Sequence, residues 1–383
     1  MEKVKLTDIC DFQGGSQPPK EEWSFDEQEG YIRMLQIRDF TQGERVTPEY
    51  IKISNTTKMC EANDILIARY GASIGKILTG LAGAYNVAIM RTIPDTSRIK
   101  KLYLYYYLKS PYFQNAILNV GSRAAQAGFN KEDLSKLDIE CPELIKQDKI
   151  IAVLEKLECI IEKRKIELSN LDDLIKARFV EMFGSPVSNP MSWEKRTLKE
   201  VCIKLNDGSH FSPESFETGD YKYVTAKNIK FSGFDFSNIT YVPEAVHRPI
   251  FDRCNPEFED VLYIKDGATT GVAIVNTLDE EFTLLSSVAL LKQDRSIMNG
   301  YFLATLLNNK DMYLNIRNNM GGAAITRLTI AKLNAIEIIV PPIELQNQFA
   351  DFVRQVDKSK VAVQKALDET QTLFDSLMQE YFG

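Results

Sequence analysis

The fragment of this sequence that comes nearest to a nucleotide-binding loop is Gly71-Ala-Ser-Ile-Gly75-Lys76. Such a loop cradles phosphates with backbone N–H groups, and its motif requires four residues between the glycines and a Ser or Thr after the lysine. Here three residues separate the glycines, and Ile77 follows the lysine. A related segment, Gly267-Ala-Thr-Thr-Gly271, is followed by Val272 and lacks the lysine as well. The shared Gly-x-x-x-Gly pattern predicts a tight turn after a strand, or a backbone that approaches a ligand such as DNA.

Two other features could carry chemistry, and both fall short of a catalytic set. Asn255-Pro-Glu-Phe258 differs by Glu257 from the Asn-Pro-Pro-Phe loop with which amino-methyltransferases hold a flipped adenine, and no glycine-rich loop for S-adenosylmethionine accompanies it. His210 and His247 lie far apart without Cys or Asp ligands at helical spacing, which disfavours a zinc centre or a Ser-His-Asp triad. We expect both histidines to be surface or loop residues, and the chain to have no catalytic centre of its own.

Size and composition indicate two globular domains. A chain of 383 residues exceeds what one hydrophobic core usually supports. The six scattered cysteines form no Cys-x-x-Cys pair, which is typical of reduced thiols in a cytoplasm. No apolar run approaches the roughly 20 residues that span a bilayer, and the start of the chain lacks the apolar core of a signal peptide. The sequence therefore predicts a soluble, cytoplasmic protein with no membrane partner.

The charge balance is unfavourable for binding nucleic acid. The formal net charge is -7 and the pI is near 5.3, whereas affinity for phosphate normally comes from excess Lys and Arg. An acidic chain can still read DNA inside a complex if partner chains neutralise much of the phosphate backbone.

The chain is an internal duplication. Asn63-Asp-Ile-Leu-Ile-Ala-Arg-Tyr-Gly-Ala-Ser-Ile-Gly75 recurs as Glu259-Asp-Val-Leu-Tyr-Ile-Lys-Asp-Gly-Ala-Thr-Thr-Gly271, an offset of 196 positions from Asp64 to Asp260. Residues 147–184 match residues 346–383 without a gap, an offset of 199 positions. Because repeats of this length reveal architecture directly, each half is interpreted as one globular unit followed by one long helix.

The two helical segments carry the apolar stripe of a coiled coil. Apolar residues recur at alternating spacings of four and three from Ile150 to Met182, interrupted by Arg164 and Arg178, and from Phe349 to Tyr381, interrupted by Lys360 and Thr370. An exposed stripe of this kind is unfavourable in water, so we expect the two helices to pair within the chain. The alternative is that each helix packs on its own domain.

The globular parts combine short β-rich runs with helices. The strand candidates are residues 65–68, 86–91, 261–264 and 287–291, and the principal helix candidates are residues 102–108 and 301–307. The predicted fold class is α+β. The halves share a pattern but little identity, as expected of two modules with one scaffold and different binding surfaces, or of drift after duplication.

This layout resembles the specificity subunits of type I restriction-modification systems. The likeness is carried in the first half by Asn63-Asp-Ile-Leu, Arg69-Tyr-Gly71, Gly75-Lys76, Tyr85-Asn-Val-Ala88, Pro142 and Gln147, and in the second by Asp207-Gly-Ser-His210, Pro213, Lys227-Asn-Ile229, Asp260-Val-Leu, Gly267, Gly271, Pro341-Pro-Ile-Glu-Leu-Gln346 and Phe382-Gly383. The first half departs from the pattern at Cys141-Pro142, which replaces the double proline. Gln147 lies five residues beyond Pro142, whereas Gln346 lies four beyond Pro342. The sequence therefore does not determine whether the two halves form the same turn here.

The resemblance implies two target-recognition domains, residues 1–142 and 185–341, each reading one half of a two-part site in double-stranded DNA. Each is followed by a helix, residues 143–184 and 342–383, and the helices would form an antiparallel coiled-coil spacer. Two methyltransferase subunits would dock on this chain to methylate adenine, and restriction/translocase subunits would join for cleavage. The resemblance implies no cofactor in this chain; S-adenosylmethionine, ATP and magnesium are expected in the partner subunits.

Residues that contact DNA are predicted from side-chain type and from position after strands and turns, because Arg, Lys, Asn, Gln, Ser and Thr make most contacts to phosphates and base edges. The DNA-binding candidates are Ser16, Gln17, Arg38, Arg69, Lys76, Arg123 and Gln126 in the first domain, and Ser209, His210, Lys227, Asn228, Lys265, Thr270 and Arg327 in the second. Two other functions remain as alternatives: a self-sufficient DNA methyltransferase or nuclease, and a coiled-coil adaptor with no DNA role.

Overall fold

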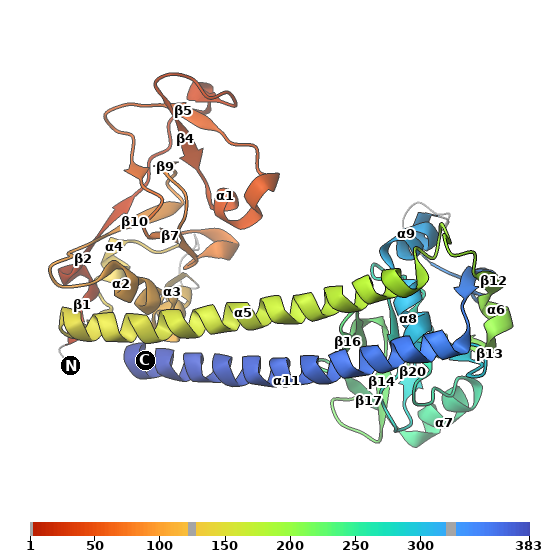
Figure 1. Ribbon diagram of the computed structural model, residues 1–383. Coiled ribbons are helices and arrows are strands. Elements are labelled where there is room, and N and C mark those ends of the chain that lie inside the picture. The colour runs from red at the N-terminus through yellow and green to blue at the C-terminus, as the bar shows by residue number, and fades with distance from the viewer. Residues whose placement is uncertain (1–2, 122–127, 319–326) are drawn as a thin grey trace. The chain divides into compact units, whose positions relative to one another are not determined.

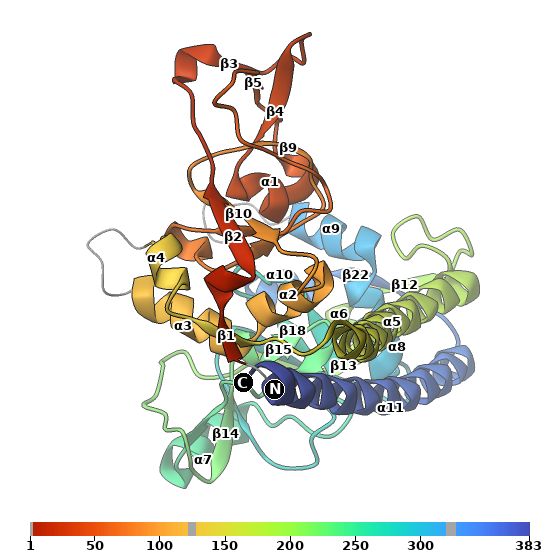
Figure 2. The same cartoon turned by 90° about the vertical axis from the view of Figure 1, so that its left-hand side faces the viewer.

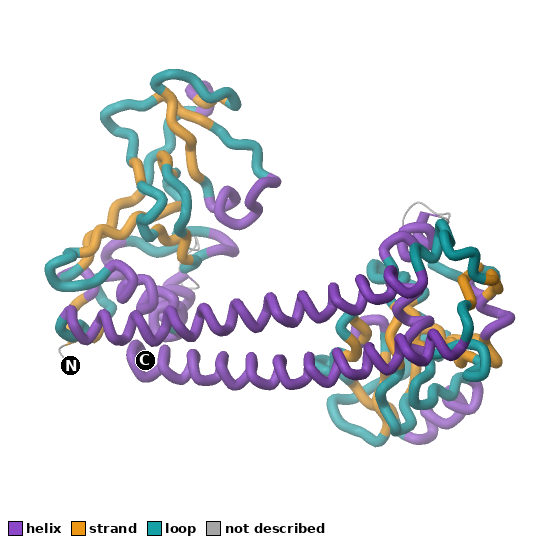
Figure 3. Tube along the Cα trace, viewed as in Figure 1, coloured by secondary structure: helices purple, strands orange, loops and turns teal. Residues whose placement is uncertain are grey.

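The computed structural model describes residues 3–121, 128–318 and 327–383, and the chain divides into two compact units. Unit 1 comprises Met1–Lys165 together with Lys365–Gly383, and unit 2 comprises Ile166–Gln364. Each unit therefore contains one globular head and part of both long helices, α5 (Leu144–Phe183) and α11 (Ile343–Phe382). Figure 3 shows the two helices as uninterrupted coils, whereas the heads mix strands and loops with short helices.

The head of unit 1 is built on two larger sheets and the two-stranded sheet β1-β11. A four-stranded antiparallel sheet has the order β2-β10-β7-β8, and a five-stranded sheet has the order β3-β5-β4-β9-β6. The strands are β1 (Lys3–Lys5), β2 (Cys10–Gly14), β3 (Trp23–Ser24), β4 (Tyr31–Leu35), β5 (Tyr50–Lys52), β6 (Met59–Cys60), β7 (Leu66–Ala68), β8 (Ile77–Leu78), β9 (Gly83–Tyr85), β10 (Ile89–Pro94) and β11 (Asp138–Glu140). The head helices are α1 (Ile37–Gln42), α2 (Lys101–Lys109), α3 (Pro111–Gly121) and α4 (Lys131–Leu134).

The head of unit 2 repeats the first sheet, in the order β13-β21-β18-β19, and replaces the second by a three-stranded sheet, β17-β14-β20, and a hairpin, β15-β16. Its strands are β12 (Glu194–Thr197), β13 (Cys202–Asp207), β14 (Tyr221–Val224), β15 (Ile229–Lys230), β16 (Gly233–Phe234), β17 (Thr240–Val242), β18 (Val261–Ile264), β19 (Ala273–Val275), β20 (Thr283–Leu284), β21 (Val288–Gln293) and β22 (Glu337–Val340). Its helices are α6 (Leu198–Val201), α7 (Glu244–Arg253), α8 (Gly300–Asn308), α9 (Lys310–Asn318) and α10 (Ile330–Asn334).

These elements confirm the α+β class and the principal helices α2 and α8. One strand begins later than predicted: β10 starts at Ile89, because Asn86–Ala88 forms a loop. The four-stranded sheets correspond strand for strand, and the parallel pair β4·β9 of unit 1 corresponds to β14·β20 of unit 2. The heads thus share one scaffold and differ mainly in what surrounds the second sheet.

The two long helices run antiparallel where they meet in unit 2. Phe179 of α5 packs edge-on against Phe349 of α11 at 5.6 Å between ring centroids. Further back along α5, the Asp172 carboxylate accepts from the Lys360 Nζ at 2.7 Å. Residue numbers therefore fall on one helix as they rise on the other, and Lys360, a polar interruption of the predicted stripe, is explained by its carboxylate partner. Burial alone would lower the pKa of Lys360, but Asp172 and Asp357 raise it.

The end of α11 packs on the head of unit 1 and not on the head that precedes it in the chain. The Phe382 ring lies 5.0 Å from that of Tyr103 and 6.4 Å from that of Tyr107, both on α2. Figure 1 shows the end marked C beside α2 and the start of α5. By the same logic Phe183, at the end of α5, packs against Phe302 of α8 in unit 2 at 4.8 Å. Helix pairing is confirmed, and each helix starts on its own head and ends on the other.

A buried glutamine fixes the start of each long helix. Gln147 Nε2 donates to the Pro142 carbonyl at 2.7 Å, and its Oε1 accepts from the Lys100 N–H at 2.7 Å. Gln346 Nε2 donates to the Pro341 carbonyl at 2.7 Å, and its Oε1 accepts from the Asn299 N–H at 2.9 Å. The local turn is therefore the same in both halves, with Pro142 corresponding to Pro341 and Glu143 standing in place of the second proline.

One expectation about the histidines is wrong. His210 is exposed, but His247 is fully buried on α7, where its ring stacks on Tyr221 of β14 at 3.7 Å. Figure 2 shows α7 beside β14. His247 Nδ1 lies 2.8 Å from the Thr283 hydroxyl, so the imidazole is a hydrogen-bonded core group. Burial lowers its pKa, and hydrogen bonding to Glu281 opposes this shift.

In the described part of the chain, none of the helices has the length and apolar character required to cross a membrane.

Candidate nucleic-acid interface

In unit 1, four loops far apart in sequence meet at the end of the four-stranded sheet. The Gly15 N–H donates to the Ile89 carbonyl at 3.0 Å and the Ser16 N–H to the Tyr85 carbonyl at 3.1 Å. The Arg69 N–H donates to the Ala88 carbonyl at 2.8 Å, and Tyr70 forms a bridge with Gly128. We call this site corner 1; it comprises Gly15–Gln17, Arg69–Tyr70, Asn86–Ala88 and Gly128–Phe129.

Unit 2 builds the same site from equivalent residues. The Ser209 N–H donates to the Leu284 carbonyl at 2.7 Å, the Lys265 N–H to the Ser287 carbonyl at 2.9 Å, and Asp266 forms a bridge with Arg327. We call this site corner 2; it comprises Gly208–His210, Lys265–Asp266, Leu285–Ser287 and Arg327–Leu328. Seven of the predicted DNA-binding residues, Ser16, Gln17, Arg69, Ser209, His210, Lys265 and Arg327, therefore fall in two matching places.

A glycine allows each corner to close. A Cβ on Gly15 would lie 2.1 Å from the Asn86 carbonyl oxygen, and a Cβ on Gly208 would lie 1.9 Å from that of Leu284. Both distances are far below van der Waals contact, so any side chain at these positions would force the loop that follows β2 or β13 away from the sheet. The loops that carry Ser16-Gln17 and Ser209-His210 are thus held by backbone packing.

The basic residue at corner 1 carries a charge that no carboxylate among the described residues balances. The Arg69 Nε donates to the Phe129 carbonyl at 3.2 Å, and its guanidinium lies 5.0 Å from the centroid of the Tyr70 ring. In the described ranges Arg69 forms no ion pair, and its side chain is half-buried. A guanidinium bound only to carbonyls and an aromatic face keeps its full positive charge at the surface.

The equivalent residue at corner 2, Lys265, is neutralised. Its side chain is 2% exposed, and the Nζ lies 2.7 Å from an Asp266 carboxylate oxygen and 3.4 Å from one of Asp207. Three further cationic or basic groups surround these carboxylates: His210 and Arg253 beside Asp207, and Arg327 beside Asp266. The most exposed members of this network are His210 and Arg327, whose side chains are 56% and 61% exposed, followed by Arg253 at 42%.

Two further candidates, Arg38 and Lys227, occupy equivalent positions beside the corners. Both follow the strand whose last carbonyl binds a corner loop: Leu35 accepts from the Asn86 N–H at 3.2 Å, and Val224 accepts from the Leu285 N–H at 3.0 Å. Both side chains are exposed, and Arg38 pairs with Glu49. Arg38 and Lys227 do not align at either repeat offset, 196 or 199, because the segments that precede them in the two halves differ in length.

Three candidates have structural partners close by. Asn228 is buried, and its side chain accepts from the Thr225 N–H at 3.0 Å, as a cap. Thr270 is buried and donates to the Gly267 carbonyl at 2.7 Å within the Gly-x-x-x-Gly turn. Ser209 is buried and donates to the Phe211 carbonyl at 2.6 Å. With Lys265, these side chains shape corner 2 and its surroundings from inside. Arg123 and Gln126 lie outside the described residues.

The glycine-flanked turns are tight turns, as predicted. Gly71, Gly75, Gly267 and Gly271 all have positive φ, a conformation that side-chain-bearing residues adopt rarely. The turns differ at the residue after the second glycine. Lys76 is exposed in unit 1, whereas Val272 is buried in unit 2. Lys76 remains a surface cation on the turn between β7 and β8.

The repeated aspartates before β7 and β18 hold turns and do not form part of the corners. Asp64 accepts from the Glu61 N–H at 3.0 Å and pairs with Arg91 at 2.8 Å. Burial would raise its pKa, but that backbone bond and Lys101 lower it. Asp260 repeats the turn with the Glu257 N–H at 2.8 Å, and burial raises its pKa. The motif that revealed the duplication is thus structural.

Sequence reasoning missed the acidic half of corner 2. Asp207 and Asp266 are not expected in a site that binds phosphate, and their role becomes visible only when the sheet brings the ends of β13 and β18, on either side of β21, to the same site. Phe211, 63% exposed directly after His210, was also missed. The signal that could have found Asp207 is its place in Asp207-Gly-Ser-His210, the segment that corresponds to Gly14-Gly15-Ser16-Gln17.

Comparison with known proteins supplies the family. The type I restriction modification DNA specificity domain matches the chain twice, at residues 1–170 and 190–370. The chain belongs to the type I restriction-modification specificity family. The MjaVIII specificity subunit of a type I restriction enzyme from Methanocaldococcus jannaschii is 21% identical over 388 residues, covering 95% of this chain and 89% of that one.

Two solved structures share the fold of this specificity subunit. The S subunit of a type I restriction-modification system from M. genitalium superposes with a TM-score of 0.58 at 17% identity, covering 100% of this chain and 96% of that one. A chain from a structure of type I restriction-modification complex assembly and conformational transition gives a TM-score of 0.59 at 19% identity, covering 100% and 97%. At these identities the likeness establishes the architecture of the specificity subunit, including its two heads and two long helices.

Proposed function

We propose that the two corners are the DNA-reading surfaces of this specificity subunit, and that each reads one half of a two-part site in double-stranded DNA. One observation carries the proposal. The two heads differ in their second sheets, yet both place equivalent loops, which carry Arg69 and Lys265, beside a glycine that packs closely on the neighbouring backbone. A shared scaffold with different side chains at one site is what two readers of different half-sites require.

Charge supports a different mode of reading at each corner. Corner 1 offers the unbalanced guanidinium of Arg69 beside the exposed Gln17, suited to a phosphate or to the O6 and N7 acceptors of guanine. Corner 2 offers His210 and Arg327 beside the carboxylates of Asp207 and Asp266. Carboxylates accept hydrogen bonds from the amino groups of cytosine or adenine. The acidic total charge is compatible with this function because most of the DNA backbone would be neutralised by partner subunits.

The partners follow from the family. We propose that two methyltransferase subunits dock on this chain and transfer a methyl group to adenine, and that restriction/translocase subunits join them in the cytoplasm for cleavage. S-adenosylmethionine, ATP and magnesium would be bound by those subunits, and the chain itself would have no catalytic role. We propose that the long helices set a fixed spacing between the half-sites, since two readers held at a constant separation impose a constant number of base pairs between the sequences they contact.

The proposal is tested by co-expressing the chain with its methyltransferase subunit in a host without adenine methylation and mapping modified adenines by sequencing. We expect one asymmetric two-part motif with a constant spacer, and no motif when the chain is omitted. The same motif without the chain would overturn the proposal. Binding of S-adenosylmethionine by the purified chain alone would instead support a self-sufficient methyltransferase.

Alanine substitutions at the equivalent positions 69 and 265 should have different effects. Arg69→Ala removes an unpaired surface cation, so we expect about tenfold weaker DNA binding by the assembled complex without unfolding of the head. Lys265→Ala leaves Asp207 and Asp266 short of a buried partner, so we expect a free energy of unfolding lower by about 3 kcal/mol. Gel-shift titration and thermal unfolding measure the two effects, with the exposed Lys227→Ala as a stability control. A loss of thermal stability in Arg69→Ala, or unchanged thermal stability in Lys265→Ala, would contradict these roles of the two residues.

A further inference from the structure

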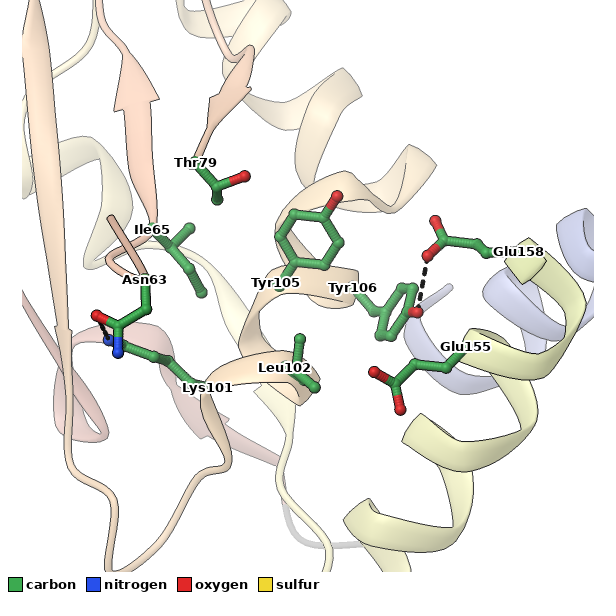
Figure 4. Close-up of a pocket in the computed structure, with 9 residues that line it drawn as sticks. All are labelled: Asn63, Ile65, Thr79, Lys101, Leu102, Tyr105, Tyr106, Glu155 and Glu158. Carbon is green, nitrogen blue, oxygen red and sulfur yellow. Dashed lines mark hydrogen bonds between the residues drawn. The ribbon is translucent and has the colours of Figure 1, made fainter. Parts of the chain in front are cut away.

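A cavity of about 570 Å³ opens in unit 1 between α2 of the head and the first turns of α5. Its walls include Asn63, Leu102, Tyr105, Tyr106, Glu155 and Glu158. Figure 4 shows the tyrosines and Leu102 on the α2 side and the two carboxylates on the α5 side, facing one another across the cavity. The corners are formed by other loops, and no role described above uses this cavity.

Most polar groups around the cavity have partners within unit 1. Glu158 accepts from the Tyr106 hydroxyl at 2.9 Å and from the Lys109 Nζ at 2.9 Å. Burial raises the pKa of Tyr106, and its hydrogen bond to Glu158 raises it further. Asn63 accepts from the Lys101 Nζ at 3.4 Å. Glu155 is different, because it makes neither a hydrogen bond nor an ion pair with any residue the structure describes. The cavity therefore presents one free carboxylate beside aromatic and aliphatic walls.

Unit 2 shows what fills the equivalent place. At the repeat offset of 199, Glu155 corresponds to Arg354 and Leu102 to Tyr301; at the offset of 196, Asn63 corresponds to Glu259. The Arg354 guanidinium lies 2.9 Å from a Glu259 carboxylate oxygen and 4.8 Å from the centroid of the Tyr301 ring. The same guanidinium also pairs with Asp351 at 2.9 Å, so an arginine of the chain itself spans from α11 to the head, bound by two carboxylates and one aromatic face.

In unit 1 the arginine is missing and the helix carries a carboxylate in its place. We infer that this cavity receives an arginine side chain from a methyltransferase subunit docked on α5, which would bind Glu155 and lie against Tyr105 and Tyr106. The inference rests on the proposed function, since that function supplies the docking partner. It goes further by naming the side chain and the site.

The chemistry of the cavity favours arginine over other occupants. A planar guanidinium can donate hydrogen bonds to carboxylates while its face packs on an aromatic ring. Arg354 does this in unit 2, where it donates to Glu259 and to Asp351 and lies against Tyr301. The lysines next to the cavity are occupied, because Lys101 pairs with Asp64 at 3.0 Å and Lys109 with Glu158 at 2.9 Å. A second consequence is asymmetry: unit 2 already holds its own arginine, so only one of the two docking sites would use an arginine from the partner.

The experiment titrates the full-length chain with its purified methyltransferase subunit by calorimetry. The variants are Glu155→Gln, which removes the charge, and Glu155→Arg, which supplies the arginine from the helix as in unit 2. Glu132→Arg, a side chain 80% exposed on α4, is the matched control for charge reversal elsewhere in unit 1. Thermal unfolding of each variant checks the fold, and Glu155→Gln breaks no hydrogen bond or ion pair among the residues that the structure describes.

We expect the wild-type chain to bind two methyltransferase subunits. Glu155→Gln should weaken one of the two sites by about tenfold and Glu155→Arg by about fiftyfold, because a carboxylate paired with a desolvated arginine is lost or replaced by a like charge. The other site and the Glu132→Arg control should be unchanged. Two unweakened sites in both Glu155 variants would overturn the inference and leave the proposed function standing. No binding by the wild-type chain would overturn both.

Discussion

Replacing residues 1–142 with the corresponding segment of another specificity subunit is expected to change one half of the methylated DNA motif completely and to leave the other half unaltered. Corner 1 is assembled only from residues within this segment, from Gly15 to Phe129, and corner 2 only from residues within 185–341. Mapping of methylated adenines in cells that express the chimera measures both halves at once.

The junction of this chimera is favourable because the turn at the start of α5 is held through main-chain atoms of the head. Gln147 binds the carbonyls of Arg98 and Pro142 and the N–H of Lys100, none of which depends on the side chain of the donor segment. Two side-chain requirements remain: an aromatic surface on α2 for Phe382, which Tyr103 and Tyr107 provide here, and partners for Glu158, which Tyr106 and Lys109 provide.

The reciprocal exchange of residues 185–341 is the control, and it should alter only the other half of the motif. A chimera that changes both halves, or that changes the spacer while both halves remain, would contradict independent reading by the two corners. A chimera that loses methylation altogether should be checked for folding of unit 1, since loss of the α2 surface would expose the end of α11.

The sequence predicted the repeated architecture well because repetition and heptad spacing are local signals. The offset of 199 located both long helices, and the buried Gln147 and Gln346 occupy the same turn even though one proline is missing. The offset could not show which head each helix end contacts. Phe183 and Phe382 lie beyond the regular stripe, and their burial depends on α8 and α2, which are far away in sequence.

The candidate site was predicted in part for a similar reason. Residue type and position after strands were sufficient to bring Ser16, Arg69 and Lys265 to the corners. They could not reveal burial: Lys265 is covered because Asp207, at the end of β13, and Asp266, the next residue in the chain, converge on its ammonium group. His247 was expected at the surface for the same reason, since its stacking partner Tyr221 lies on β14 and is not adjacent to it in the sequence.

The second large effect concerns Phe382, next to the last residue of the chain. We expect Phe382→Ala to lower the free energy of unfolding of unit 1 by about 3 to 5 kcal/mol, the usual cost of removing a buried phenyl group, and to leave unit 2 unchanged. The ring is 5% exposed and packs on Tyr103 and Tyr107, so its removal leaves a cavity beneath α2. Hydrogen exchange of the α2 amides, read separately from those of α8, measures the effect.

Phe183→Ala is the matched variant, because Phe183 occupies the equivalent position at the end of α5 and is fully buried against Phe302 and Phe349. It should deprotect α8 and spare α2, the reverse of Phe382→Ala. If Phe382→Ala deprotected α8 instead, the end of α11 would belong to the head that precedes it in sequence. The pair of variants therefore tests whether each long helix ends on the other head. If each helix end packed on the head that precedes it in the chain, Phe183→Ala would deprotect α2 and Phe382→Ala would deprotect α8.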